Sequence, residues 1–249
     1  SPVHCRPFVL LCSMCALATL MSNIVCFNFA VLCMPSTEQP INGCQSTVGY
    51  SKHDRTLLFS AVALGTLVGV APVAHATHAH GVRRVFFVGG LISTVVTAMI
   101  PLLSRIDISY FIALRFIHGM CLSTTMSTIG VITCNWAALD QRGLFMGVLT
   151  TYSQVSLIFS MPVTGRLCTS SLGWQSVFYI HSFLSGIAYA AWFAVYRDRP
   201  AEHPLMTKDE LESIERGKSS AQLQKKAAAN KLLQTPYLAI LATPAVWGV

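Results

Sequence analysis

Charge is what this sequence has least of. Only 11% of its 249 residues are Asp, Glu, Lys or Arg, whereas about 25% is usual in a soluble globular domain. Hydrophobic residues make up 53% of the chain. The charges that are present gather in short stretches between long uncharged runs, and this pattern excludes an ordinary soluble globule.

The runs without charge are each long enough to cross a bilayer. A helix needs roughly 20 mainly apolar residues to span about 30 Å of hydrocarbon, because every backbone amide must bond within the segment. We therefore expect an all-α integral membrane protein with a six-helix bundle in residues 1–196 and the truncated start of a seventh helix in residues 236–249. The uncharged runs are Pro7–Thr37, Thr56–Val82, Val85–Ser104, Phe116–Leu139, Gly143–Gly165 and Leu167–Tyr196.

Signatures of enzymes are also missing. The sequence has no nucleophile elbow, Walker loop, dinucleotide fingerprint or pair of CxxC motifs with zinc spacing. His75, His78 and His80 cluster at one end of the second run. A membrane di-iron oxygenase would need several such clusters, so we expect no enzymatic activity, no cofactor and no metal site.

The basic residues indicate orientation rather than nucleic-acid binding, although the net charge is +7. No basic segment is interleaved with aromatics as a nucleic-acid site would require. With the N-terminus in the cytoplasm, the outer segments hold few basic residues, as the positive-inside rule predicts. The inner segments then carry Arg6, Arg83, Arg84, Arg142 and the basic residues from Arg197 to Lys231, and the outer ones carry Lys52, Arg55, Arg105 and Arg166.

Most of the nine cysteines lie in or beside apolar runs and are interpreted as small packing residues. Cys44 and Cys168 are the two expected on the outer side, where a disulfide between them is left open. The packing group is Cys5, Cys12, Cys15, Cys26, Cys33, Cys121 and Cys134.

Residues 197–235 are hydrophilic and are expected to form a cytoplasmic linker. Thr207 followed by Glu210 is a capping-box pattern, and Leu211, Ile214 and Leu223 form a narrow apolar stripe behind it. The pattern predicts an amphipathic helix that lies in solvent or on the membrane surface, with a calmodulin-like partner as the alternative.

Proline and glycine recur within the spans, and helices that contain them can bend and pack closely. They are Gly65, Gly69 and Pro72 in the second span, Gly119 and Gly130 in the fourth, and Pro162 and Gly165 in the fifth. Gly143 and Gly147 make a small-xxx-small pair, which favours close contact between two helices.

Arg115 is the ionised residue that lies well inside an expected span. Such residues usually face the bundle interior and bind a counter-charge, so an anionic substrate is the leading interpretation, with snorkelling toward Asp107 as the alternative. His118 lies three residues on, on nearly the same helix face. It is expected either to help hold the anion, to carry a proton, or to make a structural hydrogen bond.

Other polar residues lie within the spans, namely Tyr152 and Gln154 in the fifth, and Asn23 and Asn28 in the first. They are expected to line a cavity for the substrate, or else to form interhelical hydrogen bonds worth about 0.6 kcal/mol each.

Four segments together resemble the anion:cation symporter family of the major facilitator superfamily, which includes sialin, sodium-phosphate cotransporters and vesicular glutamate transporters. They are RFIHG (115–119), PVTG (162–165), GWQSVFY (173–179) and PAEHPLMTKDELESI (200–214), and FNFAVLCM (27–34) resembles the family more loosely.

The resemblance implies a twelve-helix carrier made of two halves, of which this chain holds the N-terminal one, with the substrate site at the midplane between them. The implied partners are a small organic anion or phosphate, a coupling cation (proton or sodium), the lipid bilayer and the missing C-terminal half. The implied membrane is the plasma membrane or a vesicular or lysosomal one. Arg115 matches the family's fourth-helix arginine, which binds the substrate's negative charge.

Two departures bear on coupling and gating. Leu122 stands where many proton-coupled members have a glutamate. In the loop after the second span, Gly81, Arg83 and Arg84 fit the superfamily's gating motif, but His78 takes the place of its aspartate. We expect this gate to use an altered ion pair that responds to pH.

The sequence thus predicts secondary active transport of small anions by alternating access. A seven-helix receptor and a truncated, non-transporting membrane fragment are the alternatives.

Overall fold

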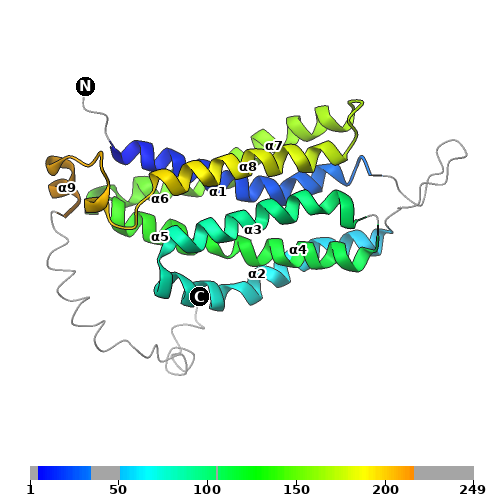
Figure 1. Ribbon diagram of the computed structural model, residues 1–249, viewed down its shortest axis with the longest axis horizontal. Coiled ribbons are helices and arrows are strands. Elements are labelled where there is room, and N and C mark those ends of the chain that lie inside the picture. Colours follow the sequence, from blue (N-terminus) through cyan, green and yellow to red (C-terminus); the bar gives the residue numbers. More distant parts are fainter. Residues whose placement is uncertain (1–4, 35–50, 105, 216–249) are drawn as a thin grey trace, which may run out of the picture.

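The computed structural model describes residues 5–34, 51–104 and 106–215 (Figure 1). The long helices lie side by side along one axis, and the short helix α9 lies at the end where α5 and α8 finish. The elements are α1 (Cys5–Ala30), α2 (Lys52–His80), α3 (Val82–Leu103), α4 (Ile108–Leu122), α5 (Thr124–Trp136), η1 (Leu139–Gln141), α6 (Arg142–Thr150), α7 (Tyr152–Cys168), α8 (Gln175–Val195), η2 (Pro200–Glu202) and α9 (Lys208–Glu215).

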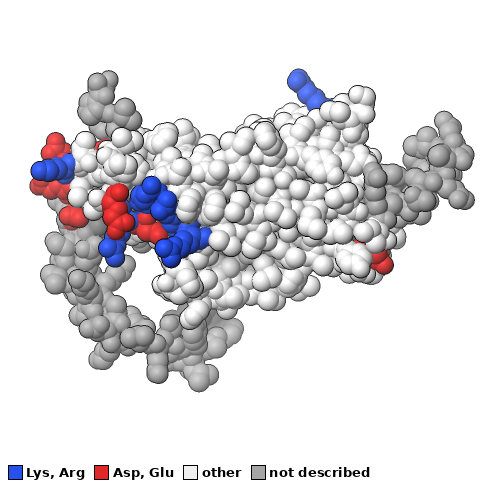
Figure 2. All heavy atoms as spheres, viewed as in Figure 1, with Lys and Arg blue, Asp and Glu red and all other residues white. Residues whose placement is uncertain are grey.

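Among the described residues, six helical stretches are long and apolar enough to span a membrane, which confirms the expected all-α, six-helix membrane bundle. The chain is therefore a multi-pass membrane protein. Figure 2 shows the charged side chains gathered toward the two ends of the described part, with a broad uncharged belt between them. The spans are Cys5–Ala30, His53–His80, Val82–Leu103, Ile108–Trp136, Leu139–Cys168 and Gln175–Val195, and the expected seventh helix lies outside the described residues.

The fourth and fifth spans are each interrupted, which the apolar pattern does not show. Between α4 and α5, the hydroxyls of Ser123, Thr124 and Thr125 donate to the carbonyls three residues earlier, at 2.6–2.7 Å. Thr151, between α6 and α7, donates in the same way to Val148 O at 2.7 Å. Side-chain bonds to helix carbonyls compete with the backbone ladder and bend helices, so both interruptions have a local chemical cause.

Helices α2 and α4 cross at backbone distance because three glycines meet there. A Cβ on Gly119 would lie 2.0 Å from Val62 O, and one on Gly65 would lie 2.0 Å from Phe116 O. Gly69 is similarly crowded by the backbone of Met120. No side chain fits at these positions, so close packing is found at this crossing. Gly130 and Gly165 do not share it, because a Cβ at either would meet no atom within 4 Å among the described residues.

The small-xxx-small pair does not take part in such packing. A Cβ on Gly143 or Gly147 would meet no atom within 4 Å among the described residues. The close contact expected there was wrong for this bundle, because α6 turns that face away from its neighbours within the described part.

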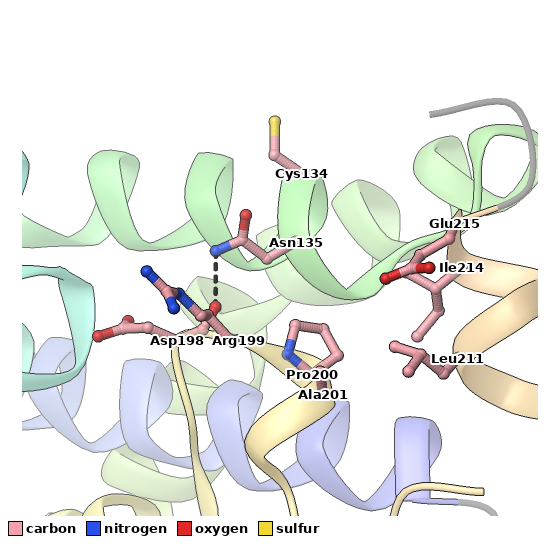
Figure 3. A pocket seen from close by; sticks show the side chains of 9 residues that line it. All are labelled: Cys134, Asn135, Asp198, Arg199, Pro200, Ala201, Leu211, Ile214 and Glu215. Atoms are coloured by element: carbon pink, nitrogen blue, oxygen red, sulfur yellow. Dashed lines mark hydrogen bonds between the residues drawn. The ribbon is translucent and has the colours of Figure 1, made fainter. Parts of the chain in front are cut away.

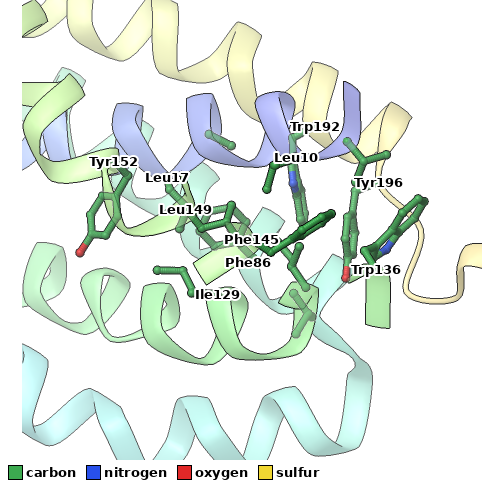
Figure 4. Close-up of a cluster of buried hydrophobic side chains, with 14 of the residues drawn as sticks. Leu10, Leu17, Phe86, Ile129, Trp136, Phe145, Leu149, Tyr152, Trp192 and Tyr196 are labelled. Carbon is green, nitrogen blue, oxygen red and sulfur yellow. The ribbon is translucent and has the colours of Figure 1, made fainter. Parts of the chain in front are cut away.

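Aromatic side chains fix the end of the bundle where α5 and α8 terminate (Figure 4). Trp192 stacks on Tyr196 with ring centroids 4.6 Å apart, and Phe86 meets Trp192 edge-on at 4.9 Å. Trp136 donates from Nε1 to Arg197 O at 3.0 Å. These contacts hold the start of the linker against α5. We call this end, which carries Arg6, Arg83, Arg84, Arg142 and Arg197, the basic end.

A disulfide closes the opposite end of the bundle, which we call the disulfide end. It joins Cys33, just after α1, to Cys168, the last residue of α7. The partner of Cys168 is therefore Cys33 and not Cys44, which lies outside the described residues. The interpretation of Cys33 as a packing residue is therefore wrong: it lies within the first uncharged run but beyond the end of α1.

The start of the linker packs back onto the bundle. Thr207 Oγ1 accepts a hydrogen bond from Glu210 N at 3.3 Å, as the capping pattern predicts, and α9 begins directly after it. Ile214 is 2% exposed. His203 is also buried and lies with Nδ1 3.1 Å from Cys5 Sγ. Leu223, the third member of the expected apolar stripe, lies outside the described residues.

Candidate functional site

Arg115 lies two turns into α4 and is 1% exposed. Its Nη1 donates to Ile24 O of α1 at 3.1 Å, and its Cζ lies 3.7 Å from the centroid of the Phe27 ring. Phe27 is held in turn by an edge-on contact with Phe111, at 5.2 Å between centroids. The cation is thus fixed between α1 and α4 by one carbonyl and one aromatic face, and it does not snorkel toward Asp107.

The other edge of this guanidinium is unused. Nε and Nη2 of Arg115 are buried and have no hydrogen-bond partner among the described residues. These two nitrogens point to the same side of the planar group, which is the arrangement that binds a carboxylate or phosphate through two parallel bonds. Leaving a buried charged donor without a partner costs at least about 1–3 kcal/mol of free energy, so an anion is the expected partner of this edge.

The described part of the chain supplies no carboxylate for that edge. Within residues 5–34, 51–104 and 106–215, no acidic side chain lies within ion-pair distance of Arg115. Asp107, the acid on the same stretch of chain, caps α4 by accepting from Ser109 N at 2.8 Å. This bond holds the pKa of the Asp107 carboxyl below its usual range, so Asp107 is ionised but serves the helix N-terminus.

His118 is fully buried one turn after Arg115, and its Nε2 faces α3. Nε2 lies 3.0 Å from Thr97 Oγ1 and 3.3 Å from Ser93 O. The Thr97 hydroxyl already donates to Ser93 O at 2.7 Å, so both of these oxygens accept and Nε2 must carry the hydrogen. The neutral imidazole therefore has a bare lone pair on Nδ1, which is buried without a partner.

A network of polar side chains, formed by Asn23, Ser93 and Ser185, continues from His118 to α1 and α8. Asn23 Nδ2 donates to Ser93 Oγ at 3.3 Å and to Ser185 Oγ at 2.9 Å, while Asn23 Oδ1 has no partner in the described part of the chain. Asn23 directly precedes Ile24, whose carbonyl holds Arg115. The sequence suggested Asn23 only as one cavity-lining candidate, and neither Phe27 nor the acceptors on α3 were anticipated.

The remaining expected site residues are not gathered around Arg115. Asn28 and Gln154 are exposed, and Gln154 Oε1 accepts from Ser153 Oγ at 2.8 Å. Tyr152 is buried in the cluster that includes Phe145 and Leu149, on the side of that cluster away from Trp136 and Tyr196 (Figure 4). Arg115 and His118 are the two expected residues that the structure brings together.

The turn between α2 and α3, which the sequence predicts to be a gating loop, is organised by an acid that the sequence did not single out. Asp198 Oδ1 accepts a hydrogen bond from Arg83 N at 3.0 Å. Gly81 has a φ of 81°, and a Cβ added to it would lie 2.6 Å from Asp198 Oδ2. The Arg83 guanidinium instead donates to Phe193 O at 2.8 Å. Asp198, from the start of the linker, thus holds the turn between α2 and α3, and a side chain on Gly81 would displace it.

Two cavities flank Asp198. One, of about 470 Å³, lies between α5 and the linker, where Asn135 Nδ2 donates to Asp198 O at 3.0 Å (Figure 3). The other, of about 400 Å³, includes His78 and Gly81 in its lining. His78 and Arg84 are exposed at this end. The predicted role of His78 in a gate is not tested by these contacts.

Comparison with known proteins gives the family. Residues 8–249 match the family described as Major Facilitator Superfamily. An uncharacterised transporter of Caenorhabditis elegans is 25% identical, over 89% of this chain and 48% of that protein. Human sodium-dependent phosphate transport protein 1 is 22% identical, over 94% and 51%. Bovine vesicular glutamate transporter 2 is 24% identical, over 74% and 31%.

These relatives are named as transporters, and the phosphate and glutamate transporters among them confirm the resemblance to the anion:cation symporters. The chain spans about half the length of the first two relatives, 48% and 51%. With its helical architecture and six membrane-spanning stretches, the chain belongs to the major facilitator superfamily.

Proposed function

We propose that the protein containing this chain is a secondary carrier that moves small organic anions or inorganic phosphate across a membrane by alternating access. The observation that carries the proposal is the buried Arg115 with its unpartnered Nε and Nη2 edge. A cation in a bilayer-spanning bundle is costly unless it meets a counter-charge. The described chain offers none, so a solute is the natural occupant.

The names of the relatives agree with this chemistry. Inorganic phosphate and glutamate are both oxyanions that fit a two-donor guanidinium edge. The Nε and Nη2 edge of Arg115 is buried, so we propose that side chains around the guanidinium, including the Phe27 ring over its face, shift when the anion enters from the space between the two halves. Residues 1–196 would form one rocking bundle, residues 197–235 the linker, and residues 236–249 the start of the second half.

Uptake by the full-length protein tests the proposal. Purified protein is reconstituted into liposomes, and accumulation of labelled phosphate and labelled L-glutamate is followed with an imposed proton or sodium gradient. We expect at least one anion to accumulate above protein-free liposomes, and the excess unlabelled anion to compete. Absence of accumulation with both anions and both gradients would contradict the proposal.

The orientation follows from two independent features. Disulfides form in oxidising compartments, so the Cys33–Cys168 bridge supports a disulfide end that faces the outside of the cell or an organelle lumen. The arginines of the basic end then face the cytoplasm, as the positive-inside rule requires. We propose a cytoplasmic N-terminus, in a plasma, vesicular or lysosomal membrane.

Thiol labelling checks both the pairing and the orientation. In the full-length protein at the cell surface or in sealed vesicles of known sidedness, Cys33→Ser is expected to expose one additional thiol, Cys168, to a membrane-impermeant maleimide on the outer or lumenal side. Cys44→Ser is the matched control and should release no such thiol. A new thiol reached only from the cytoplasmic side would refute the orientation, and release by Cys44→Ser alone would refute the pairing.

A further inference from the structure

We propose that His118 is the proton-coupling group of this carrier, and that it takes up a proton at Nδ1 when an anion binds to Arg115. The inference rests on the proposed function. A proton from the aqueous phase adds to the Nδ1 lone pair, and no bond of the solute changes. The hydrogen bonds from Nε2 to Thr97 Oγ1 and Ser93 O persist in both protonation states, so the ring keeps its position.

The tautomer makes Nδ1 the titrating atom. Because Nε2 already carries its hydrogen toward two acceptors, protonation can occur only at Nδ1, which lies buried without a partner in the described structure. A second buried acceptor without a partner, Asn23 Oδ1, belongs to the same network of polar side chains. The site thus contains unpartnered acceptors as well as the unpartnered donors of Arg115. A bound anion would accept from Arg115, and a proton on Nδ1 would turn this buried acceptor into a donor.

Charge decides when His118 is protonated. Around it, α3 contributes the neutral Ser93 and Thr97, α1 contributes Asn23 and the Cys26 thiol, and α4 itself contributes Arg115 and the Cys121 thiol. The Tyr189 phenol of α8 lies near Cys121. Arg115 is the charged group of this set.

The acids within the described spans are far from this set along the chain. They are Asp54 and Asp140, each within the first residues of its helical stretch. α2 also packs on α4, and its remaining titratable side chains are at its two ends. With the site empty, Arg115 therefore repels a second positive charge at His118, and a bound anion cancels that repulsion.

The coupling works in both directions. If the anion raises the proton affinity of His118, a proton on His118 must raise the affinity for the anion by the same factor. A sodium ion is a poorer fit, because Ser93 O and Thr97 Oγ1 are already engaged by hydrogen bonds and Arg115 would repel the ion. The His118 imidazole thus carries the coupling proton at a site where the described residues supply no carboxylate.

Proton-linked binding tests the inference directly. L-glutamate and phosphate are titrated calorimetrically into purified full-length protein, in buffers that differ in ionisation enthalpy. For the wild type we expect uptake of up to about one proton per anion at mildly acidic to neutral pH, because a bound anion cancels the repulsion from Arg115 and imidazole ordinarily titrates with a pKa of about 6.5. The dissociation constant should rise by up to about tenfold per pH unit in this range. Glutamate is the cleaner probe, because both of its carboxyls, with pKa values of about 4, stay ionised over this range.

His118→Gln is the informative variant, because its amide nitrogen can still donate to Thr97 and Ser93 while no titrating atom remains. It should bind the anion with no linked proton and with an affinity independent of pH. Its elution profile and melting temperature, compared with those of the wild type, report whether it has folded, and His118→Asn serves if it has not.

The outcomes separate the two proposals. Wild-type binding without proton uptake, with or without a sodium requirement, would overturn the role of His118 and leave the carrier function standing. Undiminished proton uptake in His118→Gln would overturn it as well. If neither anion binds the wild type at any pH, the anion site itself is wrong and the coupling proposal falls with it.

Discussion

Replacing Arg115 with alanine is expected to abolish anion uptake by the full-length protein. The substitution removes the buried positive charge and both unpartnered donors at once. Two charge-assisted hydrogen bonds are worth about 1.5–3 kcal/mol each, so anion affinity should fall by at least about a hundredfold. The bundle should still fold, because the guanidinium makes one hydrogen bond, to Ile24 O, and its burial is itself costly.

Arg115→Lys separates charge from geometry. An ammonium keeps the positive charge but cannot offer two parallel donors while also bonding a carbonyl. We expect it to retain weak uptake, with an apparent affinity about ten to a hundred times lower than that of the wild type. Arg166→Ala is the matched control, since it removes an exposed arginine near the disulfide end, and it should transport normally. Radiolabelled uptake at several anion concentrations gives each constant.

Two results would contradict this account of Arg115. Wild-type affinity in Arg115→Ala would mean that the anion binds elsewhere. Wild-type affinity in Arg115→Lys would mean that the unused edge is not what recognises the anion. Loss of folded protein in both variants, measured by size-exclusion chromatography, would assign Arg115 a structural role and remove the main support for the site.

The architecture was predictable because it depends on one-dimensional information. A bilayer-spanning helix must be long and uncharged, so the number of spans follows directly from the spacing of charges. The interruptions of the fourth and fifth spans follow from runs of hydroxyl residues, Ser123–Thr125 and Thr150–Thr151, which the apolar count treats as neutral. The disulfide partner of Cys168 was missed because Cys33 lies just beyond a helix end, where hydropathy does not distinguish the membrane from its border.

The site was only partly predictable because the direction in which a side chain points depends on the three-dimensional fold. Simple helix geometry already separates some candidates: Asn23 and Asn28 lie about 140° apart around α1, and Tyr152 and Gln154 about 200° apart around α7. They could not all line one cavity. Arg115 contacts the Phe27 ring and the Ile24 carbonyl, and Asp198 bonds to the turn between α2 and α3. Each of these contacts joins segments distant in sequence, so no local pattern predicts them.

Gly119→Ala is expected to be strongly destabilising. The new carbon would lie 2.0 Å from Val62 O, and the obstacle is backbone, so α2 and α4 must separate. Overpacking of this kind costs about 1–3 kcal/mol where side chains can yield, and more where they cannot. Because α4 carries Arg115 and His118, separation would also displace both from α1 and α3.

Gly130→Ala provides the matched control for that crossing. It adds the same methyl group in α5, where no atom lies within 4 Å, and alanine favours the helix by about 0.5–1 kcal/mol. After solubilisation and heating, Gly130→Ala should therefore elute as monodisperse protein at or above the wild-type melting temperature, while Gly119→Ala aggregates well below it. Equal melting temperatures for the two variants would show that α2 and α4 do not pack at backbone distance, and the placement of Arg115 and His118 that depends on this crossing would have to be abandoned.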